Sequence, residues 1–247
     1  MCGVFGVYEV GDASKSVAIG LHTMQHRATD FTGIVASDGA HFYRFSGAGI
    51  ARRVYTEKMV KFLHGNHALG HIRYPTVTDD PTRDNTQPIV GTAQGMPIAI
   101  AHNGNITNRE ELEALLFGKR FSTSMDTELI LRLLETKESE DFDTNLIAVL
   151  RLLKGSFSLG ILLPDRLIAV RDPQGNRPLS IARLNGGYCI SSETCAFTSL
   201  GAKYISDVEP GTFVSLSAGA DPVITKFADF SPKQCQFERI YYAHPAS

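Results

Sequence analysis

The second residue of this chain is a cysteine that stands just before a short apolar run, Val4 to Tyr8. The run is typical of a buried strand, so removal of Met1 would make Cys2 the first residue of that strand. Its thiol would then lie beside its own free α-amine, whose ordinary pKa of roughly 8 leaves part of it unprotonated at neutral pH. A nucleophile activated by the N-terminal amine is a known catalytic arrangement. The alternative is a buried cysteine without a chemical role.

Three further segments carry residue types that could complete such a site. Arg73, at the end of an apolar run, could present its planar fork of donors to a carboxylate, although a surface ion pair is the simpler interpretation. Asn103 and Gly104 could donate to a developing oxyanion, although Asn-Gly on its own is more typical of a tight hairpin turn. Asp126 and Glu128 fit the first turn of a helix, and one of them could instead bind a substrate ammonium.

Taken together, these residue types are what acyl transfer from the side-chain amide of an α-amino acid requires. A thiol with its own base, two oxyanion donors, a cation for a carboxylate and an anion for an ammonium imply glutamine as the substrate. His64, His67 and His71 have spacings that superficially resemble metal ligands. No cysteine pair or second carboxylate cluster is near them in the sequence, so we expect no metal site.

The composition is that of a cytoplasmic enzyme. A net charge of -2 and a pI near 6.4 give no electrostatic attraction to nucleic acid or to an anionic membrane. No apolar stretch approaches the roughly 18 residues that span a bilayer, and the N-terminus lacks the features of a signal peptide. The four cysteines have no paired spacing, which argues against a disulfide framework or a zinc ribbon.

Apolar periodicity predicts clustered antiparallel strands and separate blocks of amphipathic helix. Besides the N-terminal run, strands are expected at 33–37, 41–46, 68–73, 98–102, 156–163, 166–171, 179–184, 188–191, 212–216 and 239–242. Helices are expected at 14–26, after a capping box at 107–110, after the Ser/Thr cluster at 122–124, at 144–153 and at 192–200 with Gly201 as the stop. This arrangement predicts layers, with sheets inside and helices outside.

Short segments throughout the chain also resemble a known family, the class II glutamine amidotransferase domains. They are MCGVFGVY, LHTMQHRATDFTGI, GHIRYPT, QPIV, AHNGNITN, STSMDTELIL, RDPQGNRPLSI, SSETCAF, VEPGTFV and CQFERIYYAHPAS. The likeness runs nearly end to end and in order. RDPQGNRPL and FERIYYAHPAS make it strongest to the amidophosphoribosyltransferase branch, whose enzymes catalyse the first committed step of purine synthesis.

The resemblance implies an α+β fold of the N-terminal nucleophile hydrolase type, a four-layer α/β/β/α sandwich with mostly antiparallel sheets. It implies hydrolysis of glutamine to glutamate and ammonia through a thioester. It also assigns roles to residues: Cys2 as the nucleophile, Asn103 and Gly104 as the oxyanion donors, Arg73 and Thr76 for the substrate carboxylate, Asp126 for its ammonium, and Arg27 as a support of the site.

The chain departs from the family pattern in two places. Ala28 and Thr29 replace the usual Gly-Gln or Gly-Glu, and Phe31 stands where a small residue is usual, which puts the rate in doubt more than the reaction type. Cys235 occupies the position of one iron–sulfur ligand in some members. The other cysteines do not match the remaining ligand positions, so an iron–sulfur cluster is not expected.

For domain organisation, the resemblance implies a glutamine amidotransferase domain over 1–235 and, over 236–247, the start of a connection toward a phosphoribosyltransferase domain that the chain lacks. Mg²⁺ would belong to that second domain, and no cofactor is expected here. The expected partner is that domain or a separate synthase subunit that receives the ammonia; self-association is left open. The alternatives are a stand-alone glutaminase subunit that supplies another synthase, such as a glutamate synthase, and a non-catalytic regulatory homologue.

Overall fold

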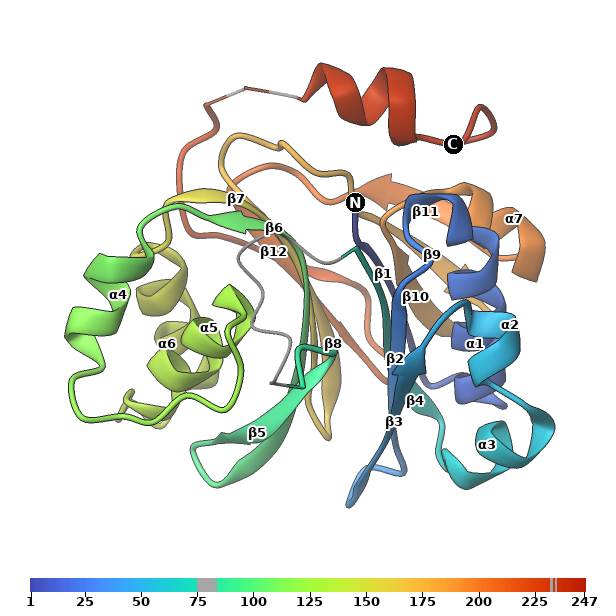
Figure 1. Cartoon of the computed structure of the whole chain (residues 1–247), viewed down its shortest axis with the longest axis horizontal. Coiled ribbons are helices and arrows are strands. Elements are labelled where there is room, and N and C mark those ends of the chain that lie inside the picture. Colours follow the sequence, from blue (N-terminus) through green and yellow to red (C-terminus); the bar gives the residue numbers. More distant parts are fainter. Residues whose placement is uncertain (75–83, 232, 234) are drawn as a thin grey trace.

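Two antiparallel sheets form the centre of the computed structural model, which describes residues 1–74, 84–231, 233 and 235–247 (Figure 1). The first sheet has the strand order β11-β9-β10-β1-β4-β2-β3 and the second the order β13-β12-β8-β7-β6-β5. The first contains β1 (Gly3–Tyr8), β2 (Phe31–Ser37), β3 (Phe42–Ala48), β4 (His67–Arg73), β9 (Ser180–Leu184), β10 (Gly187–Ser191) and β11 (Lys203–Asp207). The second contains β5 (Ile89–Ala93), β6 (Met96–Ile106), β7 (Gly155–Leu162), β8 (Arg166–Arg171), β12 (Thr212–Ser217) and β13 (Val223–Lys226).

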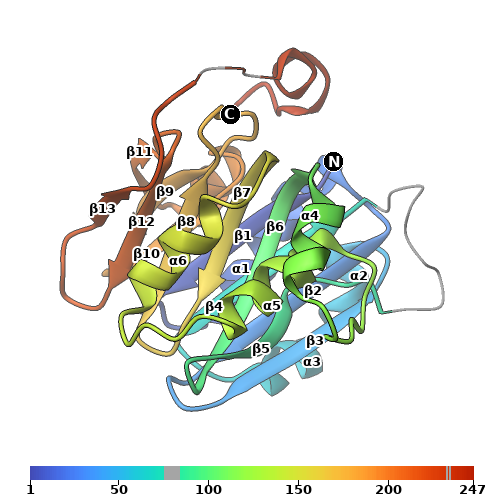
Figure 2. The same ribbon diagram turned by 90° about the vertical axis from the view of Figure 1, so that its left-hand side faces the viewer.

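Helices cover the outer face of each sheet (Figures 1 and 2). The first sheet carries α1 (Ala13–Thr23), α2 (Ala51–Val54), α3 (Glu57–Phe62) and α7 (Cys195–Leu200). The second carries α4 (Arg109–Leu115), α5 (Asp126–Glu135) and α6 (Phe142–Leu150). Two short turns complete the chain, the 3₁₀ turn η1 (Gln25–Arg27) and the π-helical η2 (Glu238–Tyr242). The expected α/β/β/α order of layers is therefore confirmed.

Three apolar clusters fill the three interfaces between these layers. One joins the second sheet to α4, α5 and α6, and another joins the first sheet to its own helices. The third lies between the two sheets and includes Val4, Leu69, Ala99 and Ala101. Side chains alternate between the two faces of a strand. The side chain two positions away from any of these four residues on the same strand therefore also faces the space between the sheets. This alternation decides which residues face the space between the sheets.

The close approach of α1 to the first sheet depends on a glycine. A Cβ atom at Gly70 of β4 would lie 2.3 Å from Cγ1 of Val17 on α1. Any side chain at this position would therefore push the helix away from the strand that precedes Arg73.

Some elements differ from the sequence-based expectation. Residues 239–242 were expected to form a strand but lie in η2, where Phe237 and Tyr241 stack with ring centroids 5.5 Å apart, as four-residue helical spacing allows. The predicted capping box is also wrong, because α4 begins at Arg109 and its N-cap residue is Asn108 rather than Thr107. Edge strands β11 and β13 were missed because most of their residues are exposed and show no apolar pattern. The short helices α2 and α3 were missed as well, and α3 has no fully buried residue.

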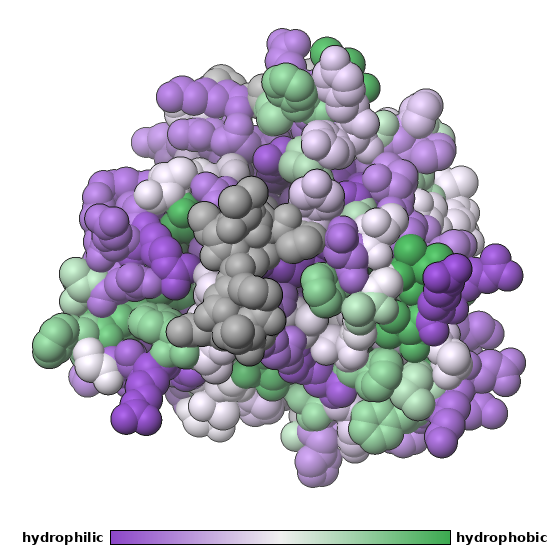
Figure 3. Space-filling model, viewed as in Figure 1, coloured by the Kyte–Doolittle hydropathy of each residue, from purple (hydrophilic) through white to green (hydrophobic). Residues whose placement is uncertain are grey.

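The surface gives little further indication of function. Figure 3 shows hydrophilic and apolar side chains interspersed on one face of the molecule. Among the described residues, no helix is long and apolar enough to cross a membrane.

Candidate active site

Strand register brings Cys2 and Arg73 side by side at one end of the first sheet. Gly3 of β1 pairs with Ile72 of β4, and Cys2 and Arg73 are the next residues outward on their strands. Val4 and Leu69 point into the cluster between the sheets, so Cys2 and Arg73 point the same way by alternation. The sequence-based pairing of a thiol with a cation at a strand end therefore has a structural basis.

The second sheet contributes Asn103 from the opposite side of the same space. Ala99 and Ala101 of β6 belong to the cluster between the sheets, and Asn103 is the next residue on that face. Both views place the N-terminus near the end of β6 that carries Asn103 (Figures 1 and 2). The Asn103 side chain is buried, and its Nδ2 has no hydrogen-bond partner within the described part of the chain.

Asn103 and Gly104 do not form the hairpin turn that their sequence alone suggests. Both lie inside β6, paired with Ser158 and Phe157 of β7. A Cβ atom at position 104 would lie 2.1 Å from the carbonyl oxygen of Ser156, so the crowded strand pair requires glycine there. The dipeptide is thus explained by close packing at a strand end rather than by a turn.

The structure separates the two carboxylates at the start of α5. Asp126 accepts a hydrogen bond from the backbone N–H of Ile106 at 2.9 Å, and its other oxygen lies 3.2 Å from Nδ1 of His102. Burial alone would raise the pKa of Asp126, but His102, the Ile106 N–H and the charge of Arg73 together hold it below its usual value. Asp126 is therefore an ionised carboxylate in the electrostatic environment of Arg73 and Cys2.

Glu128, by contrast, is fully engaged within its own helix end. Its oxygens accept hydrogen bonds from the backbone and hydroxyl groups of Ser122 and Thr123, and it forms an ion pair with Arg132 at 2.9 Å. Its side chain is buried. Of the two acids that the sequence left open, Asp126 is the one available to a ligand.

The environment of Cys2 determines how its thiol can be activated. Burial raises the pKa of the thiol; a backbone hydrogen bond from Tyr74 and the Arg73 charge act in the opposite direction without cancelling the rise. A thiol of this kind needs a base. Burial also lowers the pKa of the N-terminal amine, which here belongs to Met1 and donates to the carbonyl oxygen of Arg27 at 3.0 Å.

A buried cluster of charges holds the backbone of Cys2. Nε of Arg27 donates to the carbonyl oxygen of Cys2 at 2.8 Å, and its Nη1 lies 2.5 Å from both Oε1 of Glu193 and Oε1 of Glu238. Burial would raise the pKa of Glu193, but the Arg27 guanidinium lowers it to about 2. The support expected of Arg27 thus has a concrete geometry at both the N-terminal amine and Cys2.

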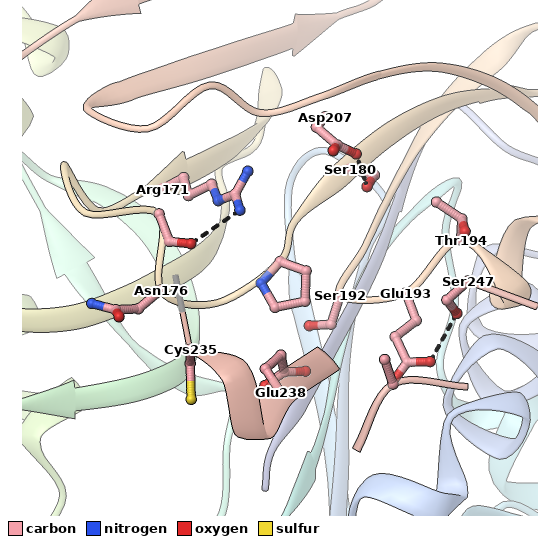
Figure 4. Close-up of a pocket in the computed structure, with 13 residues that line it drawn as sticks. Arg171, Asn176, Ser180, Ser192, Glu193, Thr194, Asp207, Cys235, Glu238 and Ser247 are labelled. Atoms are coloured by element: carbon pink, nitrogen blue, oxygen red, sulfur yellow. Dashed lines mark hydrogen bonds between the residues drawn. The ribbon is translucent and has the colours of Figure 1, made fainter. Parts of the chain in front are cut away.

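The acids of this cluster come from segments far apart in the sequence. Glu193 follows β10, and Glu238 is the first residue of η2. Ser247 Oγ and the His244 N–H each donate to Oε2 of Glu193 at 2.9 Å, so the C-terminal segment closes over the cluster. Figure 4 shows Glu193, Glu238 and Ser247 around a cavity of about 290 Å³.

Sequence reasoning gave no role to Glu193, Glu238 or His102, although all three are within the quoted motifs SSETCAF, CQFERIYY and AHNGNITN. Nothing in their local patterns marks them, because their partners are distant in sequence. Thr76, the second residue assigned to the substrate carboxylate, lies outside the described residues. Phe31, one of the departures, is paired with Arg73 across β2 and β4.

Comparisons with known proteins identify the family of the chain. Residues 71–199 match the family model described as a glutamine amidotransferase domain. The chain is 36% identical to the chloroplastic amidophosphoribosyltransferase of Glycine max and 35% identical to the amidophosphoribosyltransferase of Methanocaldococcus jannaschii. All of this chain is matched, but only 44% and 57% of those two relatives. The chain therefore spans about half the length of the curated relatives it matches.

A solved structure shares the fold closely. The glutamine phosphoribosylpyrophosphate amidotransferase of B. subtilis, solved with ADP and GMP, superposes with a TM-score of 0.91 at 33% identity. The match covers 99% of this chain and 53% of that one. The chain belongs to the glutamine amidotransferase domain family, and it is an enzyme domain of the class II, N-terminal nucleophile hydrolase type.

Proposed function

We propose that this domain hydrolyses the side-chain amide of glutamine to glutamate and ammonia through a γ-glutamyl thioester on Cys2. The observation that carries the proposal is the convergence of three groups between the sheets: the half-buried Cys2 thiol, the Arg73 cation beside it, and Nδ2 of Asn103, which has no hydrogen-bond partner among the described residues. Asp126 adds the anion that an α-amino acid requires.

The first half of the reaction forms the thioester. With Met1 removed, the α-amine of Cys2 takes the thiol proton as the sulfur attacks the amide carbon, and the carbonyl oxygen gains negative charge. Nδ2 of Asn103 and the N–H of Gly104 stabilise that oxygen, in the manner of an oxyanion hole. The amine then returns the proton to the departing nitrogen, and ammonia leaves.

The second half hydrolyses the thioester. The same amine takes a proton from water, whose oxygen attacks the thioester carbon, and the same two donors stabilise the second oxyanion. Cleavage of the carbon–sulfur bond and return of the proton to sulfur release glutamate. An α-amine suits both steps because its ordinary pKa of roughly 8 leaves a neutral fraction at physiological pH.

Recognition of the amino acid divides between two charges. Arg73 binds the α-carboxylate, together with Thr76, and Asp126 binds the α-ammonium. The Arg27 cluster keeps Cys2 in place while its side chain reacts. No metal or cofactor takes part in these steps.

In the whole protein, we propose, the ammonia passes to a phosphoribosyltransferase domain that makes phosphoribosylamine for purine synthesis. The names of the two amidophosphoribosyltransferase relatives support this assignment. The domain itself would then occupy 1–235, and 236–247 would begin the connection to the acceptor.

Release of glutamate and of ammonia from glutamine tests the proposed reaction, with asparagine as the control substrate. Asparagine is one methylene shorter, so it cannot place both its charges and its amide correctly. We expect equal amounts of glutamate and ammonia from glutamine and little product from asparagine. Failure to hydrolyse glutamine, or equal activity on both amides, would refute the assignment.

A further inference from the structure

His102 lies directly before the Asn103–Gly104 pair, and its side chain points toward the helices rather than between the sheets. Ile98 and Ile100, on the same face of β6, belong to the cluster between the second sheet and its helices. The His102 side chain is only 1% exposed. A polar ring buried in this way costs free energy unless its nitrogens have partners.

The contacts of the ring place a hydrogen on Nδ1, and Nε2 lies 3.4 Å from the carbonyl oxygen of Ser156. Nδ1 of His102 lies 3.2 Å from Oδ1 of Asp126. An ionised carboxylate can only accept, so Nδ1 carries the hydrogen and donates it. The Ile106 N–H donates to Oδ2 of the same carboxylate at 2.9 Å. Two donors on rigid strand backbone and ring therefore hold both oxygens of Asp126, which fixes the plane of its carboxylate.

The position of the ring is itself closely constrained. A Cβ atom at Gly104 would lie 2.6 Å from Nε2 of His102, so the ring packs against the glycine. The His102 N–H donates to Oε1 of Gln87 at 2.7 Å, and its carbonyl oxygen accepts from Nε2 of His71 at 3.0 Å. A residue held at its backbone and at its ring is suited to orient another side chain.

We propose that His102 is a positioning residue, which aims the Asp126 carboxylate at the α-ammonium group of the substrate. The inference rests on the proposed function. Without the imidazole, Oδ1 of Asp126 loses its partner and the carboxylate can rotate. The substrate must then order this group on binding, so affinity suffers more than the chemical step at Cys2.

Three variants of His102 test the inference: alanine removes both ring nitrogens, and asparagine and glutamine each retain a nitrogen near one of the two positions. The side-chain nitrogen of His102→Asn can take the place of Nδ1, whereas that of His102→Gln reaches the place of Nε2. We expect His102→Ala and His102→Gln to raise KM for glutamine about tenfold, with kcat within about threefold of wild type. His102→Asn should restore KM to within about threefold of wild type. Equal effects of Asn and Gln on KM, or a loss confined to kcat, would overturn the proposal.

A coupling measurement separates positioning from a general disturbance of the fold. In an Asp126→Asn background, His102→Ala should change KM by less than about twofold, because the charge it positions is already absent. Glutaramate, which is glutamine without its α-ammonium, should be hydrolysed equally well by wild type and His102→Ala. If His102→Ala raised KM equally in both backgrounds, the inference would be wrong. Absence of glutamate release by the wild type would instead refute the proposed function.

Discussion

The two sides of Cys2 differ in how their polar groups are satisfied. On the side of the Arg27 cluster, Arg27 forms ion pairs with Glu193 and Glu238. Glu193 also accepts hydrogen bonds from the C-terminal segment. On the side between the sheets, Nδ2 of Asn103 has no partner among the described residues. The Asp126 side chain there remains 22% exposed, although the rest of its surroundings are buried.

The difference indicates which groups are structural and which are reserved for a ligand. Leaving a buried donor without a partner costs about 1–3 kcal/mol, and a substrate oxygen bound at Nδ2 of Asn103 would remove that cost. Nη2 of Arg27 also lacks a hydrogen-bond partner among the described residues, but the Arg27 charge is paired with two carboxylates. We therefore expect Arg27, Glu193 and Glu238 to act as supports, and Asn103 and the partly exposed Asp126 to contact the substrate.

Loss of the nucleophile should have the largest effect. Cys2→Ala is expected to abolish glutamate release, because nothing else assigned to the site can form the thioester. Cys235→Ala is the matched control, since Cys235 is a half-buried thiol in the C-terminal segment and should leave activity unchanged. Residual turnover by Cys2→Ala beyond a trace would mean that another group performs the attack.

Removal of the Asn103 donor should have the next largest effect. We expect Asn103→Ala to lower kcat by roughly 10² to 10³ with little change in KM, because the donor acts mainly on the transition state. Steady-state kinetics with glutamine measure both constants. A change in KM alone would show that Asn103 binds the substrate rather than stabilising the oxyanion.

Disruption of the Arg27 cluster should lower the free energy of unfolding more than it changes substrate specificity. Glu193→Gln leaves part of the buried Arg27 charge uncompensated and should cost about 3 kcal/mol of the free energy of unfolding. Denaturant titration measures this loss. Intact stability in Glu193→Gln would show that the cluster is not a structural support.

The ion pair between Glu193 and Arg27 predicts that stability depends on pH. The pKa of Glu193 is lowered to about 2 in the folded chain, so the ionised carboxylate stabilises the fold at pH values above its ordinary pKa near 4.5. That contribution is lost as the pH falls from about 4.5 toward 2. Glu193→Gln should therefore lose less stability than wild type over this range. Parallel stability curves for the two proteins would contradict the assignment.

The smallest of these effects should follow from the ammonium site. Asp126→Ala is expected to raise KM at least about tenfold, equivalent to roughly 1.4 kcal/mol, and to change kcat less. Glu128→Gln is the control from the same helical turn and should leave KM unchanged, because the partners of Glu128 among the described residues are Ser122, Thr123 and Arg132 of its own segment. An equal rise in KM for both variants would show that a shift of α5, and not a charge, is responsible.

The sequence predicts the layers of the fold better than the contacts that support the candidate site. Local alternation of apolar residues was enough to predict β8 and most other strands. The motifs that resemble the family singled out Cys2, Arg73 and Asn103, and strand register places Cys2 beside Arg73. The roles of Glu193 and Glu238 depend on contacts to Arg27 across more than a hundred residues, which no local pattern encodes. Asn103 and Gly104 show the same limit. Their sequence fits either a hairpin turn or a pair of oxyanion donors, and only the pairing of β6 with β7 shows that they lie within a strand.

Whether Cys2 acts through its own free α-amine can be tested by separating the chain with Met1 from the chain without it. Intact-mass measurement would identify the two forms, and each would be assayed for glutamate release. We expect activity only in the form that begins with Cys2, together with a γ-glutamyl adduct on that residue after rapid acid quenching. Equal turnover by the form that retains Met1 would contradict this expectation.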